Sequence, residues 1–67
     1  MIDKQKAKDI AIQECLARGW VLSEPIKVYR RLFHYQVWGN ADRIGANTIV
    51  CVRRRDGKVT KASVAPF

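Results

Sequence analysis

Arginines are the residues of this 67-residue chain with the clearest chemical potential. Three of them, Arg53, Arg54 and Arg55, are consecutive, and a second pair occurs at Arg30 and Arg31. The planar guanidinium group makes paired hydrogen bonds with carboxylate and phosphate groups, so these runs indicate anion binding. They do not specify a reaction.

The residue types that usually carry catalysis are sparse. The chain has one histidine, His34, and two cysteines, Cys15 and Cys51, with no C-x-x-C motif. This set supplies neither a four-ligand zinc site nor a disulfide framework. No phosphate-binding loop, nucleophile elbow or metalloprotease motif occurs. We therefore expect a non-enzymatic protein with no catalytic residue, metal or cofactor.

The net charge of +7 is distributed unevenly. Residues 1–25 carry four basic and four acidic residues, whereas residues 26–67 carry nine basic residues against Asp42 and Asp56. Such a balance suits nucleic acid, anionic lipid or an acidic protein. No apolar run reaches the roughly 18 residues of a membrane span, and no leader pattern opens the chain. We expect one cytoplasmic domain over 1–67, with free cysteines, from a bacterium or phage.

Residues 3–18 predict the helix that begins the chain. Asp3 suits the N-cap position, and Gly19 suits the position after the last turn. Apolar residues recur at three- and four-residue spacing and are expected to form a buried stripe: Ala7, Ile10, Ala11 and Cys15. Ile12 and Leu16 are expected to widen this stripe to one side. Pro25 bars further helix.

Residues 26–38 are rich in strand formers but change phase. Ile26 and Val28 alternate on even positions, whereas Phe33, Tyr35 and Val37 alternate on odd ones. Since a strand's side-chain period is two, the chain needs either a bulge at Arg30–Arg31 or a tight bend between two short strands. A loop is expected at 39–46, followed by strands at about 47–54 and 58–64.

Asp56-Gly57 is a strong hairpin signal between the last two strands. A two-residue turn pairs Arg55 with Lys58 and unites Ile49, Cys51, Ala62 and Val64 on one face. A three-residue loop with Gly57 in a left-handed bulge pairs Arg54 with Lys58 instead. This register is favoured, because it puts a more uniformly apolar set of residues on one face: Val50, Val52, Thr60, Ala62 and Val64. In that register Cys51 faces away from the helix and is expected to be exposed.

These elements predict an α+β fold, with one N-terminal helix on one face of a three- or four-stranded antiparallel sheet in α-β-β-β order. Antiparallel pairing brings Arg30 and Arg31 to the same end of the sheet as the 53–55 run. His34, Gln36 and Trp38 extend the outer face, and Trp38 or Tyr29 is placed to stack on a base. The candidate binding residues are Arg30, Arg31, Arg53, Arg54, Arg55, Lys58 and Trp38.

Two classes of function fit this arrangement. The first is a small binding module for a protein partner, either an acidic protein or a second copy of the chain. The helix-free face of the sheet or an exposed edge strand would receive that partner. The alternative is binding of nucleic acid or another polyanion by the arginine-rich end of the sheet.

The layout also resembles a PepSY-type module. The resemblance rests on the helical run Ala7-Lys8-Asp9-Ile10-Ala11-Ile12 and on the hairpin from Arg54-Arg55-Asp56-Gly57-Lys58 to Val64. It covers about residues 5–16 and 47–64. The resemblance implies an α+β fold and a non-catalytic binding or inhibitory role, and no functional residue is carried over from it.

Overall fold

The N-terminal helix, α1, spans Lys4–Ala17 and has the ends that the sequence predicted. The carboxylate of Asp3 accepts a 2.8 Å hydrogen bond from the backbone N–H of Lys6. At the other end Gly19 has a positive φ of 75°, and the N–H of Trp20 donates to the carbonyl of Cys15 at 2.8 Å. This is the Schellman pattern, which satisfies carbonyls that the helix itself leaves without donors.

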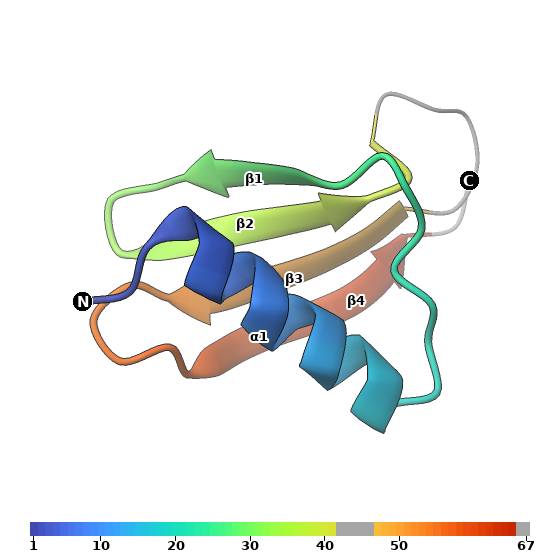
Figure 1. Ribbon diagram of the computed structural model, residues 1–67, viewed down its shortest axis with the longest axis horizontal. Coiled ribbons are helices and arrows are strands. Elements are labelled where there is room, and N and C mark those ends of the chain that lie inside the picture. The colour runs from blue at the N-terminus through green and yellow to red at the C-terminus, as the bar shows by residue number, and fades with distance from the viewer. Residues whose placement is uncertain (42–46, 66–67) are drawn as a thin grey trace.

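One narrow stripe of α1 is buried. Ala7, Ala11 and Cys15 are buried against the sheet, and their small side chains allow the helix to approach it closely. The wider stripe expected from the sequence is wrong at Leu16, whose residue surface is 62% exposed. One line of residues at four-residue spacing is enough to form the contact with the sheet, because a single helix crosses it and has only one neighbouring layer (Figure 1).

The sheet has four antiparallel strands in the order β1-β2-β3-β4, which confirms the predicted α+β fold with three or four strands. The computed structural model describes residues 1–41 and 47–65, so most of the predicted 39–46 loop lies outside the described residues. The strands are β1 (Lys27–Arg30), β2 (His34–Gly39), β3 (Asn47–Arg53) and β4 (Val59–Ala65). Inner-face residues of β2 and β3 complete the core beneath the helix: Tyr35, Val37, Val50 and Val52.

The phase change after Val28 is a bend between two strands, not a bulge. β1 ends at Arg30 and β2 begins at His34, and the N–H of Arg31 donates to the carbonyl of His34 at 2.8 Å. Phe33 therefore belongs to the turn. Its predicted place beside Tyr35 on the helix face is wrong, because a turn residue does not follow the alternation of a strand.

The β3–β4 turn is longer than either predicted loop. Arg53 pairs with Lys58 through a 2.8 Å hydrogen bond from the N–H of Arg53, so Arg54–Gly57 form a four-residue turn. Gly57 has the expected positive φ, at 78°.

Register shifts between Cys51 and Val52, which leaves Thr60 as the extra residue of β4. Four residues of the favoured set therefore share one face, as predicted: Val50, Val52, Ala62 and Val64. Val59 takes the place on that face that was predicted for Thr60.

Cys51 faces away from the helix, as the favoured register predicted, but its expected exposure is wrong. Only 8% of its surface is accessible. Cys51 lies on an inner strand between its cross-strand partners Gln36 and Lys61, and long side chains at such positions flank a small thiol closely.

Candidate binding site at the arginine-rich end of the sheet

Two turns and the N-terminus meet at one end of the sheet (Figure 1). The backbone N–H of Arg54 donates to the carbonyl of Phe33 at 3.0 Å, and the N–H of Ile2 donates to the carbonyl of Arg54 at 2.8 Å. The turns that follow β1 and β3 are therefore in direct contact. The arginine-rich end comprises the basic residues gathered there: Arg30, Arg31, Arg53, Arg54, Arg55 and Lys58.

Arg54 is committed to holding the two turns together. Its Nη1 donates to the carbonyls of Leu32 at 2.7 Å and Arg31 at 3.2 Å. Its guanidinium carbon lies 5.9 Å from the centre of the Tyr35 ring, and Nη2 lies 3.4 Å from the sulfur of Met1. Sequence reasoning placed Arg54 among the binding residues, but its Nη1 and Nη2 contact groups of the fold, and its Nε is buried without a hydrogen-bond partner among the described residues.

Arg53 is partly neutralised by Asp56. The Arg53 Nε donates to Asp56 Oδ1 at 2.9 Å, and the two groups form an ion pair. This hydrogen bond, the backbone N–H of Lys58 and the charge of Arg55 hold the pKa of Asp56 well below its usual range. The same carboxylate raises the pKa of Arg53. Asp56 therefore stays charged and offsets one cation of the cluster.

The remaining basic groups point in different directions. Arg31 folds back over the outer face of the sheet, 5.6 Å from the centre of the Tyr29 ring, and donates to Gln36 at 3.4 Å. Arg30 is paired with Tyr35 and so belongs to the helix face. Arg30, Arg55 and Lys58 are exposed and make no side-chain hydrogen bond or ion pair within residues 1–41 and 47–65. Of the six basic residues at the arginine-rich end, these three are available to an anion without breaking a described contact.

An apolar tip lies among these cations, and sequence reasoning missed it. Its members, Met1, Leu32 and Phe33, are 87%, 75% and 74% exposed. Arg54 joins them, because it contacts the sulfur of Met1 and the carbonyl of Leu32. The signal available in the sequence was the change of phase, since a bend after Arg30 necessarily puts Leu32 and Phe33 in a turn.

Trp38 does not belong to the arginine-rich end. It lies four residues along β2 from His34, or about 13 Å at the usual rise of a strand. Its cross-strand partners are Lys27 and Ile49, and its ring lies edge-on to Tyr29 with centroids 6.2 Å apart. Trp38 thus marks a second region, on the outer face.

The titratable residues do not assemble into a reactive group within the described ranges. No cluster of three or more His, Cys, Asp or Glu side chains that could hold a metal occurs there. Burial, aided by the charge of Glu14, raises the pKa of the Cys15 thiol and keeps it protonated. His34 faces outward opposite Arg53, as predicted.

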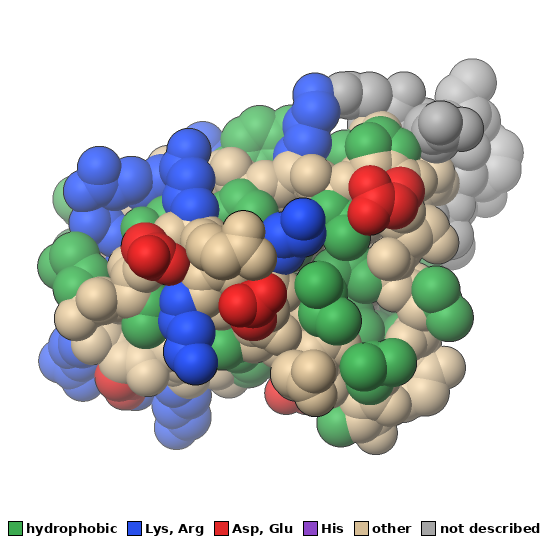
Figure 2. Space-filling model, in the orientation of Figure 1, with side chains coloured by type: hydrophobic (Ala, Val, Ile, Leu, Met, Phe, Trp, Pro, Cys, Tyr) green, Lys and Arg blue, Asp and Glu red, His purple; other side chains and the backbone are tan. Residues whose placement is uncertain are grey.

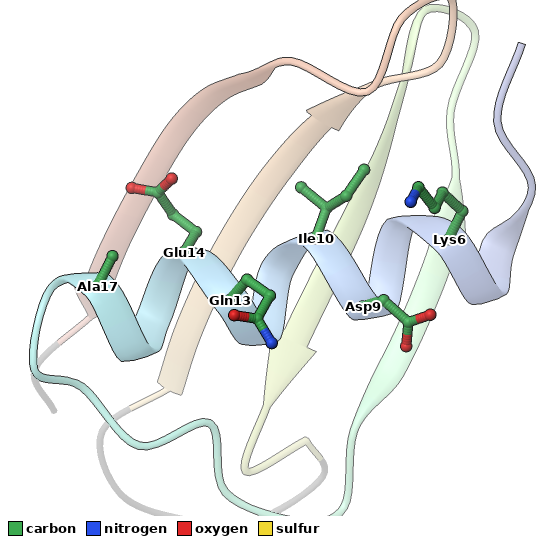
Figure 3. A pocket seen from close by; sticks show the side chains of 6 residues that line it. All are labelled: Lys6, Asp9, Ile10, Gln13, Glu14 and Ala17. Carbon is green, nitrogen blue, oxygen red and sulfur yellow. The ribbon is translucent and has the colours of Figure 1, made fainter.

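A hollow with a volume of about 320 Å³ runs along α1 (Figure 3). All of its lining residues come from this one helix: Lys6, Asp9, Ile10, Gln13, Glu14 and Ala17. Its carboxylates already have partners, since Asp9 accepts from Gln5 at 3.0 Å and Glu14 pairs with Arg18 at 2.6 Å. Both carboxylates of this groove are therefore already engaged within α1 and with Arg18 next to it.

None of the described helices is long and apolar enough to cross a bilayer. No protein-family model matches the chain, and comparisons with characterised proteins and with solved structures give no significant match. The PepSY resemblance stays a prediction based on residues of α1 and of the β3–β4 hairpin.

Proposed function

We propose that this protein is a small non-enzymatic binding module that docks an acidic protein partner at its arginine-rich end. The observation that carries the proposal is the apolar tip, with Leu32 and Phe33 about three-quarters exposed beside the available cations. A cytoplasmic location, inferred from composition, is part of the proposal.

The tip has the composition of an interface centre. Protein interfaces are anchored by aromatic and other large apolar side chains together with arginine. Burying a Leu or Phe side chain that is now in water contributes about 1.5–3 kcal/mol. Arg30, Arg55 and Lys58 would form the rim, where charge steers the partner and selects its sign.

The apolar tip also favours a protein over duplex nucleic acid. Contacts with phosphates need cations and backbone N–H groups, and they give no role to exposed Leu32 and Phe33. A second copy of this chain fits less well, because it would bring two sets of cations together.

Acidic polypeptides of defined composition test this proposal by fluorescence anisotropy at near-physiological salt. We expect a glutamate–tyrosine copolymer to bind more tightly than polyglutamate of equal charge, because only the copolymer offers apolar groups to the tip. The double substitution Leu32→Ser and Phe33→Ser should remove that preference. Substituting Arg30, Arg55 and Lys58 by glutamine should weaken binding to both polymers.

Matched controls exist on the helix. Leu16→Ser removes an exposed leucine, and Arg18→Gln removes a cation at the far end of α1. Both should bind like the wild type. Equal affinity for the two polymers, or tighter binding to a DNA duplex that ignores the Leu32 and Phe33 substitutions, would contradict a protein partner at this site.

A further inference from the structure

The face of the sheet opposite α1 is a second surface with its own composition. Register and alternation assign its residues, because cross-strand partners share a face. The open face includes the strand positions that point away from the helix: Lys27, Tyr29, His34, Gln36, Trp38, Asn47, Ile49, Cys51, Arg53, Lys61 and Ser63. The Arg31 side chain adds to it from the β1–β2 turn.

The described strand positions of the open face carry charge of a single sign. Lys27, Arg31, Arg53 and Lys61 are basic, and none of the described strand positions on this face is Asp or Glu. In the described β3–β4 turn, the carboxylate of Asp56 is paired with Arg53. The helix side differs, with acidic and basic side chains interspersed on it (Figure 2).

Two aromatic rings lie within this basic surface. Tyr29 and Trp38 meet edge to face, with ring centroids 6.2 Å apart and planes at 82°. The Arg31 guanidinium lies 5.6 Å from the centre of the Tyr29 ring, and its bond to Gln36 is long at 3.4 Å. Arg31 can therefore leave Tyr29 at little cost and turn toward a phosphate.

We propose that the open face binds single-stranded nucleic acid, with bases stacking on Tyr29 and Trp38 and phosphates held by Arg31 and Lys61. Basic surfaces with aromatic platforms bind single strands in this way, because every base has a π-face and every linkage has a charge. A second copy of this chain is disfavoured, since face-to-face contact would oppose eight cations. The inference goes beyond the proposed function and uses different residues, so either can fail alone.

Fluorescein-labelled oligo(dT) and oligo(U) of about eight nucleotides test the inference with the intact protein, by anisotropy at several salt concentrations. We expect both to bind more tightly than a duplex of equal length. The slope of log affinity against log salt should be about −1.4, as two phosphate contacts to a single strand predict. A preference between the two oligomers would distinguish RNA from DNA as the ligand.

Conservative substitutions separate stacking from charge. Tyr29→Leu should weaken binding at least about fivefold, whereas Tyr29→Phe should keep wild-type affinity because it keeps the ring. Lys61→Gln should weaken binding and flatten the salt slope by about 0.7, whereas Lys8→Gln on α1 should do neither. In a Trp20→Phe background, quenching of the remaining Trp38 fluorescence should follow binding.

Several outcomes would overturn the inference. These are equal affinity for duplex and single strand, equal loss from Tyr29→Phe and Tyr29→Leu, or full competition by polyglutamate at matched charge. Concentration-dependent dimerisation that Tyr29→Leu abolishes would instead assign the open face to a second copy. Thermal melts of each variant identify any loss that comes from unfolding, and Lys61→Gln tests the same face without altering an aromatic residue.

Discussion

Three neighbouring arginines have three different roles in this molecule. Arg53 is bound to Asp56, Arg54 donates to carbonyls of the β1–β2 turn, and Arg55 is exposed to solvent. Consecutive residues in a strand and turn point in different directions, so identical side chains meet different partners. The chemistry of the arginine run is therefore decided residue by residue.

Arg54→Ala should lower the free energy of unfolding by about 2 kcal/mol, because two carbonyls lose a charged donor. Arg54→Lys should recover only part of this, since an ammonium group does not present a planar fork. Urea denaturation measures both changes. Arg55→Ala is the matched control and should stay within about 0.5 kcal/mol of the wild type. Equal effects at the two positions would contradict the bridging role of Arg54.

The Asp56 carboxylate should give a small, pH-dependent contribution to stability. Its pKa in the folded protein lies below the value of about 3.9 in an unfolded chain, so the folded state binds fewer protons in acid. The contribution is present above about pH 4 and is lost as the pH falls. Thermal midpoints of the wild type and Asp56→Asn should therefore differ at pH 7, and the difference should shrink progressively as the pH falls below about 4, toward the much lower pKa of the folded protein. A difference that is independent of pH would exclude the ion pair as its source.

At the scale of elements, the β3–β4 hairpin combines a left-handed glycine with a bulge. Gly57 ends the turn with a φ of 78°, and Thr60 is the extra residue that brings the apolar positions of β4 back to the helix face. The longer turn and the bulge compensate each other. Burial of one face of the hairpin selects the register between β3 and β4, and the length of the turn adapts to that register.

Gly57→Ala should destabilise the protein by about 1–3 kcal/mol, because an added Cβ meets both a positive φ and the side chain of Ile10, 2.9 Å away. Gly19→Ala is the matched control. Its φ is 75° with nothing within 4 Å of the added Cβ, so it should cost about 1 kcal/mol from the backbone alone. Urea denaturation of both variants measures the difference. Equal costs would mean that Ile10 moves aside freely.

At the scale of the whole molecule, the positive charge is segregated. Residues 1–25 have no net charge, and the excess of +7 lies in residues 26–67. In the folded protein many of these cations gather at one end and on the open face. Repulsion between them lowers stability and attracts anions at the same time.

Added salt should therefore raise the thermal midpoint. Between about 20 and 300 mM sodium chloride the Debye length falls from roughly 20 Å to under 10 Å, which screens repulsion across the arginine-rich end. The rise should be a few degrees by calorimetry, and smaller in a variant carrying Arg55→Gln and Lys58→Gln. A midpoint that falls with salt would show that attractive ion pairs outweigh the repulsion.

Much of the fold could be predicted from local patterns. Asp3 and Gly19 fixed the ends of α1, and alternation assigned Val37, Val50 and Val52 to the core. Phe33 and Cys51 could not be placed in the same way. Phe33 depended on where β2 begins, and the burial of Cys51 depended on Gln36 and Lys61, which are neighbours only across strands.

The sequence by itself determined the element types and the separation of charge, because caps, periodicity and composition act over a few residues. Only the tertiary structure decided which cations are available and that Met1, Leu32 and Phe33 form an exposed tip. Those outcomes depend on contacts between distant segments, such as the bond from Arg54 to the carbonyl of Leu32, 22 residues away. Local periodicity carries no information about such contacts. These contacts nevertheless decide which side chains of a basic chain are free to bind a partner.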